Sequence, residues 1–339
     1  MSDVSIPVRV FVGTDRSQLL AVKVLEYSIR RHTDLPVEVH PMLDLPLPEP
    51  KDPRQGKRTG FSFTRFAVPQ LAGYRGRALY LDADMLVFKD IRSLWSLPFD
   101  GAKVLIQDHI PEEAQKKATS AGAPKQRIKQ TAVMLLDCGG LDWDPAKIIQ
   151  GLDGRYTYED LVYQLCILQP DEIHYTIPFE WNSLEFWNEN TCLLHYTDMA
   201  SQPWVSPNNK LGYLWLREAR RMVDEGVMTL AEVQNEIDLG YFRPSLVEEL
   251  RDPVALEGFD PARAKRLEAS DQAANYVKHK AVYEAARRRK EAMREYEEAS
   301  KTVAERGTAA KKPKGMLSKV IAAFSPVRAN MLAKGNRSV

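Results

Sequence analysis

The sequence predicts an α/β fold built on a mainly parallel sheet and followed by helices. Short apolar runs typical of buried strands recur between residues 8 and 195, and several alternate with segments whose apolar residues have helical spacing. This alternation is typical of a parallel sheet with its ligand cleft at the carboxyl ends of the strands. The 339 residues, 44% of them apolar, are enough for one large domain and an appendage.

The predicted strands are short and apolar, whereas the predicted helices carry an apolar stripe. Strands are expected at residues 8–12, 37–40, 78–81, 104–107, 131–138, 173–177 and 191–195. Helices are expected at residues 17–31, 61–71 and 158–168. The first helix ends on Arg30 and Arg31, where basic side chains favour the helix dipole. The polar residues 110–128 are expected to form a flexible helix or a lid.

The character of the chain changes after Trp204, where charged helical segments replace the strands. We expect an α/β domain over residues 1–210, a highly charged helical appendage over residues 211–306, and a basic tail over residues 307–339. Within the appendage, helices are expected at residues 211–226 and 229–239, and a long helix or a helix pair at residues 261–306.

The basic tail has two interpretations that the sequence leaves open. Residues 301–339 carry nine Lys or Arg against one acidic residue, which fits a disordered, solvated terminus. The apolar residues within 316–327 share one helical face, although Pro326 would break or kink the helix. That face and the basic charge also fit attachment to an anionic membrane surface.

Bulk composition excludes several classes of function. The net charge of +1 argues against a nucleic-acid partner. The sequence shows no secretory leader and no apolar run near the ~20 residues that span a bilayer. Cys138, Cys166 and Cys192 lie in apolar sequence without a Cys-x-x-Cys spacing, so we expect reduced core residues of a cytoplasmic protein. If the tail binds lipid, the protein is peripheral on the inner face of the membrane.

An acidic pair supplies the most informative local pattern. Asp82 and Asp84 follow a predicted buried strand, are separated only by Ala83, and precede a second apolar run at residues 85–88. Two close carboxylates repel each other unless a cation joins them, and oxygen donors favour Mg²⁺ or Mn²⁺. Such a cation also grips a diphosphate and stabilises it as a leaving group. The alternative is a solvated turn, but this pair interrupts an apolar segment.

The residues around the pair resemble glycosyltransferase family 8. A helix at residues 61–71 that bears Arg65, the segment 76–87 with Asp-x-Asp, then Asp90-Ile91 and Leu94-Trp95 occur in the order of that family. The resemblance extends over roughly residues 7–205. It implies a GT-A nucleotide-diphospho-sugar transferase fold and transfer with retention of anomeric configuration. It also implies a UDP-sugar donor, Mn²⁺ or Mg²⁺ as cofactor, and a glycan, lipid-linked or protein acceptor.

Donor-binding residues are expected at the end of the first strand and beside the acidic pair. Gly13, Thr14 and Asp15 end that strand, where a small residue and a carboxylate can take a nucleobase and its ribose. The family's corresponding segment binds uracil, although Thr14 or Asp15 could instead cap the next helix. The resemblance implies that Arg65 touches the donor and the acidic pair. Ala83, which separates the two carboxylates, is also an expected donor-binding residue. The alternative for Arg65 is an exposed helix arginine.

His195 is the expected third metal ligand. It ends an apolar strand, and residues 195–204 resemble the family's His-x-x-Gly-x-x-Lys-Pro-Trp signature, whose His binds Mn²⁺. Asp198 stands where Gly is expected, and one extra residue precedes Pro203-Trp204. Gln202 replaces the phosphate-binding Lys, so it can donate a hydrogen bond but brings no charge.

Three nearby cations are candidates for the missing positive charge. They are Lys57, Arg58 and Lys210.

Two further segments are matched to the sugar side of the family's site. Thr131 stands where the family has a sugar-contacting Asn. Glu159 matches a Gln near the anomeric carbon, and Asp160 matches the acidic residue beside it, so both are candidate catalytic residues. A carboxylate there can stabilise an oxocarbenium-like transition state, whereas the alternative is an acidic helix N-terminus. Asn182, in a Pro-x-x-Trp-Asn segment, is expected to shape the acceptor side.

Two other functions remain open at this stage. The changes at Thr131, Asp198 and Gln202 fit a catalytically weak or inactive nucleotide-sugar scaffold or sensor, although an acidic pair without its metal costs stability. A metal-dependent nucleotidyltransferase is the third alternative. It is disfavoured because the first strand is not followed by a Gly-rich phosphate loop.

Overall fold

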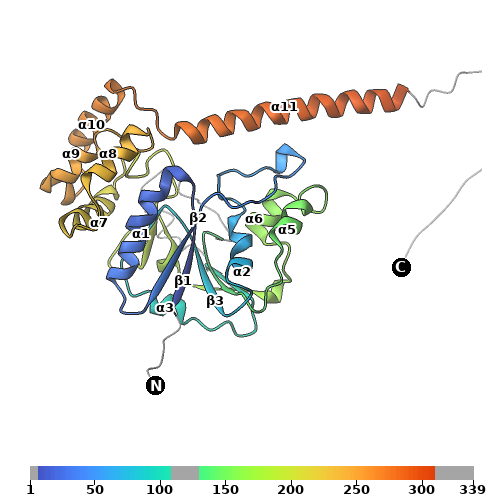
Figure 1. Ribbon diagram of the computed structural model, residues 1–339, viewed down its shortest axis with the longest axis horizontal. Coiled ribbons are helices and arrows are strands. Elements are labelled where there is room, and N and C mark those ends of the chain that lie inside the picture. The colour runs from blue at the N-terminus through green and yellow to red at the C-terminus, as the bar shows by residue number, and fades with distance from the viewer. Residues whose placement is uncertain (1–6, 108–129, 310–339) are drawn as a thin grey trace, which may run out of the picture. The chain divides into compact units, whose positions relative to one another are not determined.

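The computed structural model describes residues 7–107 and 130–309 (Figure 1). The predicted lid at residues 110–128 and the apolar stretch at 316–327 lie outside the described residues. The chain divides into two units, Met1–Arg294 and Glu295–Val339. None of the helices in the described ranges is both long and apolar enough to span a bilayer.

A six-stranded sheet in the order β2-β1-β3-β6-β5-β7 forms the centre of the described structure. Its strands are β1 (Val8–Gly13), β2 (Val37–Met42), β3 (Arg77–Asp82), β5 (Val104–Gln107), β6 (Val133–Asp137) and β7 (Ile173–Ile177). Strand β6 runs antiparallel to both neighbours, β3 and β5, whereas the other pairings are parallel. The predicted mainly parallel α/β fold is confirmed.

A small second sheet explains why the acidic pair interrupts an apolar segment. It joins β4 (Met85–Val87), β9 (Leu193–His195) and β8 (Ser183–Leu184) in that order. The chain leaves β3 at Asp82 and enters β4 at Met85, so the acidic pair lies at the crossing between two sheets. Both flanking strands are buried, which accounts for the two apolar runs.

Side-chain alternation along the strands builds a core on each face of the main sheet. In β1, Val10 packs into one cluster with Leu25 of α1 (Leu19–Arg31). Its neighbour Phe11 packs into the other cluster, with Leu161 of α6 (Tyr158–Gln164). Successive strand residues point to opposite faces, so both faces of this strand are covered. Figure 1 shows α1 on one side of the sheet and α2 (Val68–Leu71), α5 (Pro145–Gly151) and α6 on the other.

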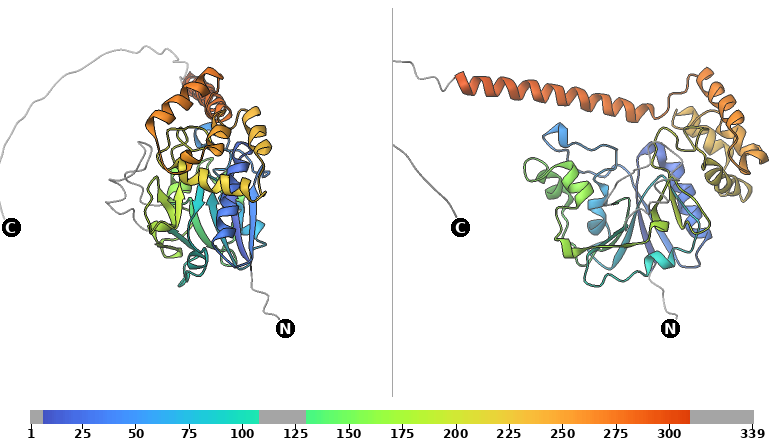
Figure 2. Two further views of the ribbon diagram at one scale, coloured as in Figure 1. Left: turned by 90° about the vertical axis from the view of Figure 1, so that its left-hand side faces the viewer. Right: turned by 180° about the vertical axis from the view of Figure 1, so that it is seen from behind.

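Helix α1 is buried on two sides and joins the sheet to the C-terminal helices. Val22, Leu25 and Ile29 face the sheet, whereas Leu20 and Val24 pack into a cluster around Trp204, Trp215 and Phe242. These helices are α7 (Gly212–Asp224), α8 (Leu230–Asp238), α9 (Leu246–Arg251), α10 (Pro261–Ala273) and the start of α11 (Lys280–Ala309). Figure 2 shows α7 to α10 gathered beside α1. The domain boundary after residue 210 stays a prediction.

Several element boundaries differ from the sequence expectation. The predicted helix at 158–168 ends at Gln164, because Leu165 takes a left-handed φ of 50°. The region 261–306 forms the helix pair α10 and α11, with positive φ at Asn275 and His279 in the break. Short helices α3 (Arg92–Trp95), α5 and α9 were not anticipated. Cys138 is buried as expected, but Cys166 is exposed because it follows the end of α6.

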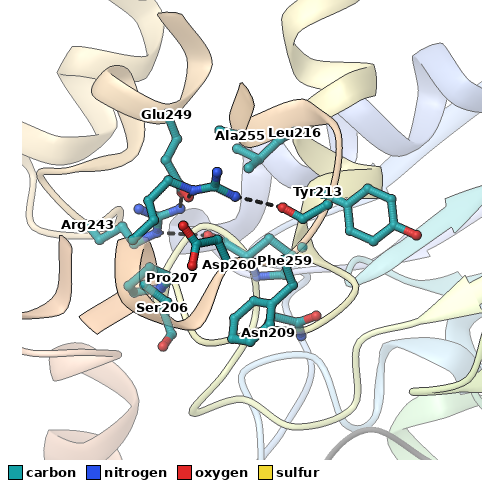
Figure 3. A pocket seen from close by; sticks show the side chains of 15 residues that line it. Ser206, Pro207, Asn209, Tyr213, Leu216, Arg243, Glu249, Ala255, Phe259 and Asp260 are labelled. Carbon is teal, nitrogen blue, oxygen red and sulfur yellow. Dashed lines mark hydrogen bonds and ion pairs between the residues drawn. The ribbon is translucent and has the colours of Figure 1, made fainter. Parts of the chain in front are cut away.

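A pocket among the C-terminal helices is occupied by a buried ion-pair network. Figure 3 shows Arg243 and Glu249 lying together there. The Arg243 guanidinium also donates to the Ser245 hydroxyl, which in turn donates to Asp271. The remaining space is about 10 Å³, no more than one water molecule needs. This pocket therefore ties helices together and leaves no room for a substrate.

Candidate active site

Strand pairing brings Asp82, Asp84 and His195 together. Antiparallel pairing of β4 with β9 sets Met85 opposite His195, so the histidine lies beside the residues just before β4. One ligand atom from each of the three side chains lies within 4.8 Å of the others. His195 Nε2 is 3.1 Å from Asp84 Oδ1. Two carboxylates and an imidazole in this arrangement are a donor set for Mn²⁺, and also for Mg²⁺.

The electrostatics of the triad favour a bound cation. Burial raises the pKa of Asp82 above its ordinary value, because the charged carboxylate loses hydration. Arg65 opposes this rise in pKa, whereas Asp84 adds to it. Asp84 Oδ1 is buried and accepts no hydrogen bond from the described residues. A cation would compensate both carboxylates, so the residues present fit a divalent metal.

Arg65 contacts Asp82, the first carboxylate of the acidic pair. It comes from the short 3₁₀ helix Thr64–Ala67 and is 6% exposed. One guanidinium nitrogen donates to the carbonyl and the hydroxyl of Thr131, both at 2.7 Å, and another lies 3.4 Å from Asp82. The ring of Tyr80 lies under the guanidinium, and its hydroxyl donates to Asp82 at 2.6 Å. Arg65 is therefore buried beside Asp82, and Thr131 orients it.

Gln202 holds the second carboxylate. Its side chain is fully buried, and its amide nitrogen donates to Asp84 Oδ2 at 2.8 Å and to the Tyr196 carbonyl at 3.2 Å. The replacement of Lys by Gln thus puts a neutral donor against Asp84. This donor fixes the orientation of the carboxylate without neutralising it.

A cavity of about 200 Å³ lies over the triad. The predicted site residues that line it are Asp15, Arg65, Asp82, Asp84, Thr131, His195 and Gln202. Asp15 also accepts hydrogen bonds from the backbone and hydroxyl of Ser17, so it caps the following 3₁₀ helix and faces the cavity. Asp15 is therefore a helix cap, whereas its role toward a nucleobase and ribose stays a prediction.

Three other predicted donor residues, Gly13, Thr14 and Ala83, are not among the residues that line the cavity. Thr14 is buried, and the Ala83 backbone donates to the carbonyl of Gly13 at 3.1 Å. A Cβ added at Gly13 would lie 2.3 Å from the Tyr80 hydroxyl. Gly13 is therefore required by close packing, and this packing brings β1 against the acidic crossing.

Glu159 and Asp160 are not among the residues that line the cavity. Both belong to the exposed first turn of α6. Asp160 forms a capping box with Thr157, and this backbone hydrogen bond lowers the pKa of Asp160. Glu159 pairs with Arg58 at 3.0 Å and is 56% exposed. These contacts are those expected of an acidic helix terminus. Their neighbour Tyr158 lines the cavity instead.

Arg58 lines the cavity, whereas Lys57 and Lys210 do not. Its guanidinium lies over the Tyr158 ring, 4.4 Å from the centroid. Lys57 instead pairs with Glu49 at 2.7 Å. Of the three cations considered to replace the family's Lys, Arg58 is therefore the one within reach of a bound ligand.

The start of α11 covers part of the cavity. Val282 lines it. On one side the His279 ring nitrogen lies 2.6 Å from the Met199 carbonyl, and on the other Arg289 donates to the carbonyls of Pro53 and Arg54. Sequence reasoning missed this contribution, because nothing in a charged helix indicates which of its residues approaches a distant sheet.

The cavity wall contains many unsatisfied polar atoms. Six lining side chains each bury one polar atom that has no hydrogen-bond partner among the described residues: Gln18 Oε1, Arg65 Nε, Asp84 Oδ1, Gln130 Nε2, Thr197 Oγ1 and Gln202 Oε1. Each such atom costs about 1–3 kcal/mol when it stays unsatisfied. Their convergence on one cavity indicates a polar ligand.

Comparison with known proteins agrees with this geometry. Residues 11–139 match the model of glycosyl transferase family 8. This match spans 129 of the 339 residues and agrees with the family resemblance of the sequence. Protein CDI of Arabidopsis thaliana is 29% identical over 231 residues, covering 62% of this chain and 86% of that protein. The lipopolysaccharide 1,2-glucosyltransferase of Escherichia coli K12 is 31% identical over 166 residues, covering 42% of this chain and 48% of that enzyme.

The family match and the lipopolysaccharide glucosyltransferase relative support a glycosyltransferase. Among solved structures, the galactosyltransferase LgtC in complex with donor and acceptor sugar analogues is 13% identical with a TM-score of 0.45, covering 62% of this chain and 95% of LgtC. GlyE of Streptococcus pneumoniae is 15% identical with a TM-score of 0.46, covering 71% of this chain and 66% of GlyE. The assignment rests on the sequence match, because the structural scores are below 0.5.

Proposed function

We propose that this family 8 glycosyltransferase moves a sugar from a nucleotide diphosphate, with UDP as the expected nucleotide, in a metal-dependent reaction. The observation that carries the proposal is the compact Asp82, Asp84 and His195 triad at the floor of a polar cavity. Mn²⁺ is the expected ion, with Mg²⁺ as the alternative, because the donor set combines oxygen atoms with one imidazole nitrogen. When bound, the ion would stabilise the diphosphate as a leaving group.

The rest of the cavity divides into regions suited to parts of the donor. Asp15 and Gln18 at the end of β1 offer hydrogen-bonding groups to a base and ribose. Arg65 and Arg58 supply positive charge, and a guanidinium fork matches phosphate oxygens. In this proposal Arg58 carries the charge that Gln202 lacks, while Gln202 keeps the Asp84 carboxylate in place.

We further propose that the configuration at the anomeric carbon is retained. The bond between that carbon and the leaving phosphate oxygen breaks, and the acceptor oxygen forms its bond on the same face. The acceptor proton then passes to the leaving phosphate, so no protein base is needed. The described lining supports this route: its carboxylates are Asp15, which caps a helix, and the two triad aspartates.

The acceptor is proposed to be a glycan, a lipid-linked sugar or a protein. A lipid-linked acceptor would suit a cytoplasmic enzyme held at the inner membrane surface by its basic tail, residues 307–339. Vesicle co-sedimentation of the full-length chain with and without anionic lipid tests this part. Binding that requires anionic lipid and falls with salt supports it.

Donor hydrolysis tests the central proposal. Purified protein is incubated with a panel of UDP- and GDP-sugars, with Mn²⁺ or with chelator, for wild type, Asp84→Asn and Asp171→Asn. The last variant makes the same change at an exposed carboxylate and serves as the control. Slow metal-dependent release of UDP from one sugar, lost only in Asp84→Asn, is the expected result.

The melting temperatures of the same samples distinguish two possible reasons for a lack of donor hydrolysis. If no donor is hydrolysed but a UDP-sugar with Mn²⁺ raises the melting temperature, a nucleotide-sugar sensor is favoured. If neither turnover nor stabilisation occurs with any donor, the proposed metal and donor site is wrong.

A further inference from the structure

A fully buried asparagine links the triad histidine to the main sheet. Asn182 ends the 3₁₀ helix Phe179–Asn182 that follows β7, and its side chain is 0% exposed. Its amide nitrogen donates to the Gln107 side-chain oxygen at 2.6 Å. Its side-chain oxygen lies 3.0 Å from His195 Nδ1. This chain of contacts runs from β5 to the end of β9.

The side-chain placements give a direction to each hydrogen bond. The Asn182 amide nitrogen donates to the Gln107 side-chain oxygen. The oxygen of Asn182 therefore faces His195 and accepts a hydrogen bond from Nδ1. A neutral imidazole carries one N–H, so its Nε2 is left with a lone pair.

That lone pair is directed at the metal-binding carboxylate. His195 Nε2 lies 3.1 Å from Asp84 Oδ1, and both atoms are acceptors when the histidine is neutral. Two acceptors at this distance repel each other unless a cation lies between them or a proton is taken up. The relay from Gln107 thus prepares the imidazole for a metal.

The pairing of β5 with β7 is irregular beside this relay. Ile106 pairs with Tyr175 and Gln107 with Ile177, so β7 has one extra residue, Thr176, at this point. Strand β7 leads into the 3₁₀ helix that ends at Asn182, so the shift lies in the segment that brings Asn182 to Gln107. Both amides are neutral, as is Gln202 on the Asp84 side, so they orient the ligands without changing the charge of the site.

We propose that Asn182, held by Gln107, is a positioning residue that selects the His195 tautomer competent for metal binding. The inference rests on the proposed metal-dependent function and deepens it, because it adds residues behind the triad. Partners of this kind raise the affinity of a metal site by about 10- to 100-fold.

Nitrogen NMR tests the tautomer directly. The ¹⁵N-labelled full-length protein is measured in chelator, at a pH where the ring is neutral, and the His195 signals are assigned by comparison with His195→Gln. Wild type is expected to carry its proton on Nδ1. A proton on Nε2 would overturn the proposal whether or not the protein binds metal or turns over a donor.

Metal affinity is then measured by calorimetric Mn²⁺ titration of three variants. Asn182→Leu removes the acceptor, and Gln107→Met releases the asparagine to rotate, so both are expected to weaken Mn²⁺ binding by about 10- to 100-fold. Asn182→Asp keeps an oxygen facing Nδ1, and a Gln107 amide that turns can donate its nitrogen to the new carboxylate. This variant is expected to bind Mn²⁺ more tightly than Asn182→Leu.

Two comparisons keep this test decisive. If Asn182→Leu does not fold, judged by its melting temperature in chelator, Gln107→Met and Asn182→Asp still contrast loss with retention of the acceptor. Wild-type affinity in the folded Leu or Met variant contradicts the proposal. Absence of Mn²⁺ binding in wild type would instead overturn the proposed metal dependence, and the tautomer measurement would still decide the relay.

Discussion

Replacing Gly13 by Ala should destabilise the fold and disturb the metal site together. The added Cβ would lie 2.3 Å from the Tyr80 hydroxyl and 3.0 Å from a ring carbon of Phe61. Ordinary contacts begin at 3.4 Å, so the hydroxyl would have to move by 3.4 − 2.3 = 1.1 Å. That hydroxyl donates to Asp82 at 2.6 Å, and a shift of this size breaks the hydrogen bond.

The magnitude follows from the buried surroundings. Forcing one extra methyl into a packed core costs about 1–3 kcal/mol, and Tyr80 is fully buried. Tyr80→Phe removes the atom that clashes, so Gly13→Ala should cost at least about 1 kcal/mol less in that background. The double mutant still meets Phe61 and therefore should not recover the full stability.

Denaturant unfolding and Mn²⁺ titration of the four proteins in this double-mutant cycle check the prediction. Gly258→Ala is the matched control, because nothing lies within 4 Å of a Cβ there and its φ is not positive. That control should change stability by less than about 0.5 kcal/mol. The reasoning is refuted if Gly13→Ala is as stable as wild type, or if its cost is unchanged by Tyr80→Phe.

Four further predictions concern the cavity lining and the first turn of α6. Gln202→Met removes the donor to Asp84, a proposed metal ligand, and should weaken Mn²⁺ binding by about 10-fold in calorimetry; unchanged affinity would contradict this role. Val282→Asp puts a charge into the cavity wall and should raise the donor KM several-fold, whereas the neighbouring exposed Tyr283→Asp should not. Glu159→Gln and Asp160→Asn should keep the hydrolysis rate within about threefold, because neither lines the cavity; a loss near 100-fold would instead indicate catalysis. The pKa of Asp160 is lowered in the folded state, so its ionised carboxylate stabilises the fold at pH values above the pKa of an unfolded Asp. This stabilisation is lost as the pH falls through the lowered pKa. Acid unfolding of Asp160→Asn should therefore lack this part of the pH dependence.

The sequence determined the sheet and the position of the acidic pair, because these depend on local patterns. Alternating apolar residues in β1 specify two covered faces, and both cores are present. The two apolar runs around Asp82 and Asp84 could be recognised as strands, although the crossing between two sheets could not. Pattern alone also missed β6 as an antiparallel strand, because direction is not encoded in the period of apolar residues.

Tertiary structure decided which predicted residues meet around the cavity. Asp82, Asp84 and His195 come together through the pairing of β4 with β9, which joins segments more than a hundred residues apart. Glu159 and Asp160 matched a family segment, but an acidic helix terminus and a catalytic carboxylate look alike in sequence. Their separation from the cavity is set by the packing of α6.

The residues behind the triad were visible only in three dimensions. Asn182 was expected on the acceptor side, yet it lies behind His195, and Gln107 carried no signal beyond its place at a strand end. Gln202 was identified as a departure from the family, but its contact with Asp84 depends on how the loop after β9 folds. The sequence gives the hydrogen-bond donors and acceptors that the chain possesses. The directions in which buried amide groups point are decided by packing, because each buried amide must find a protein partner where water is excluded.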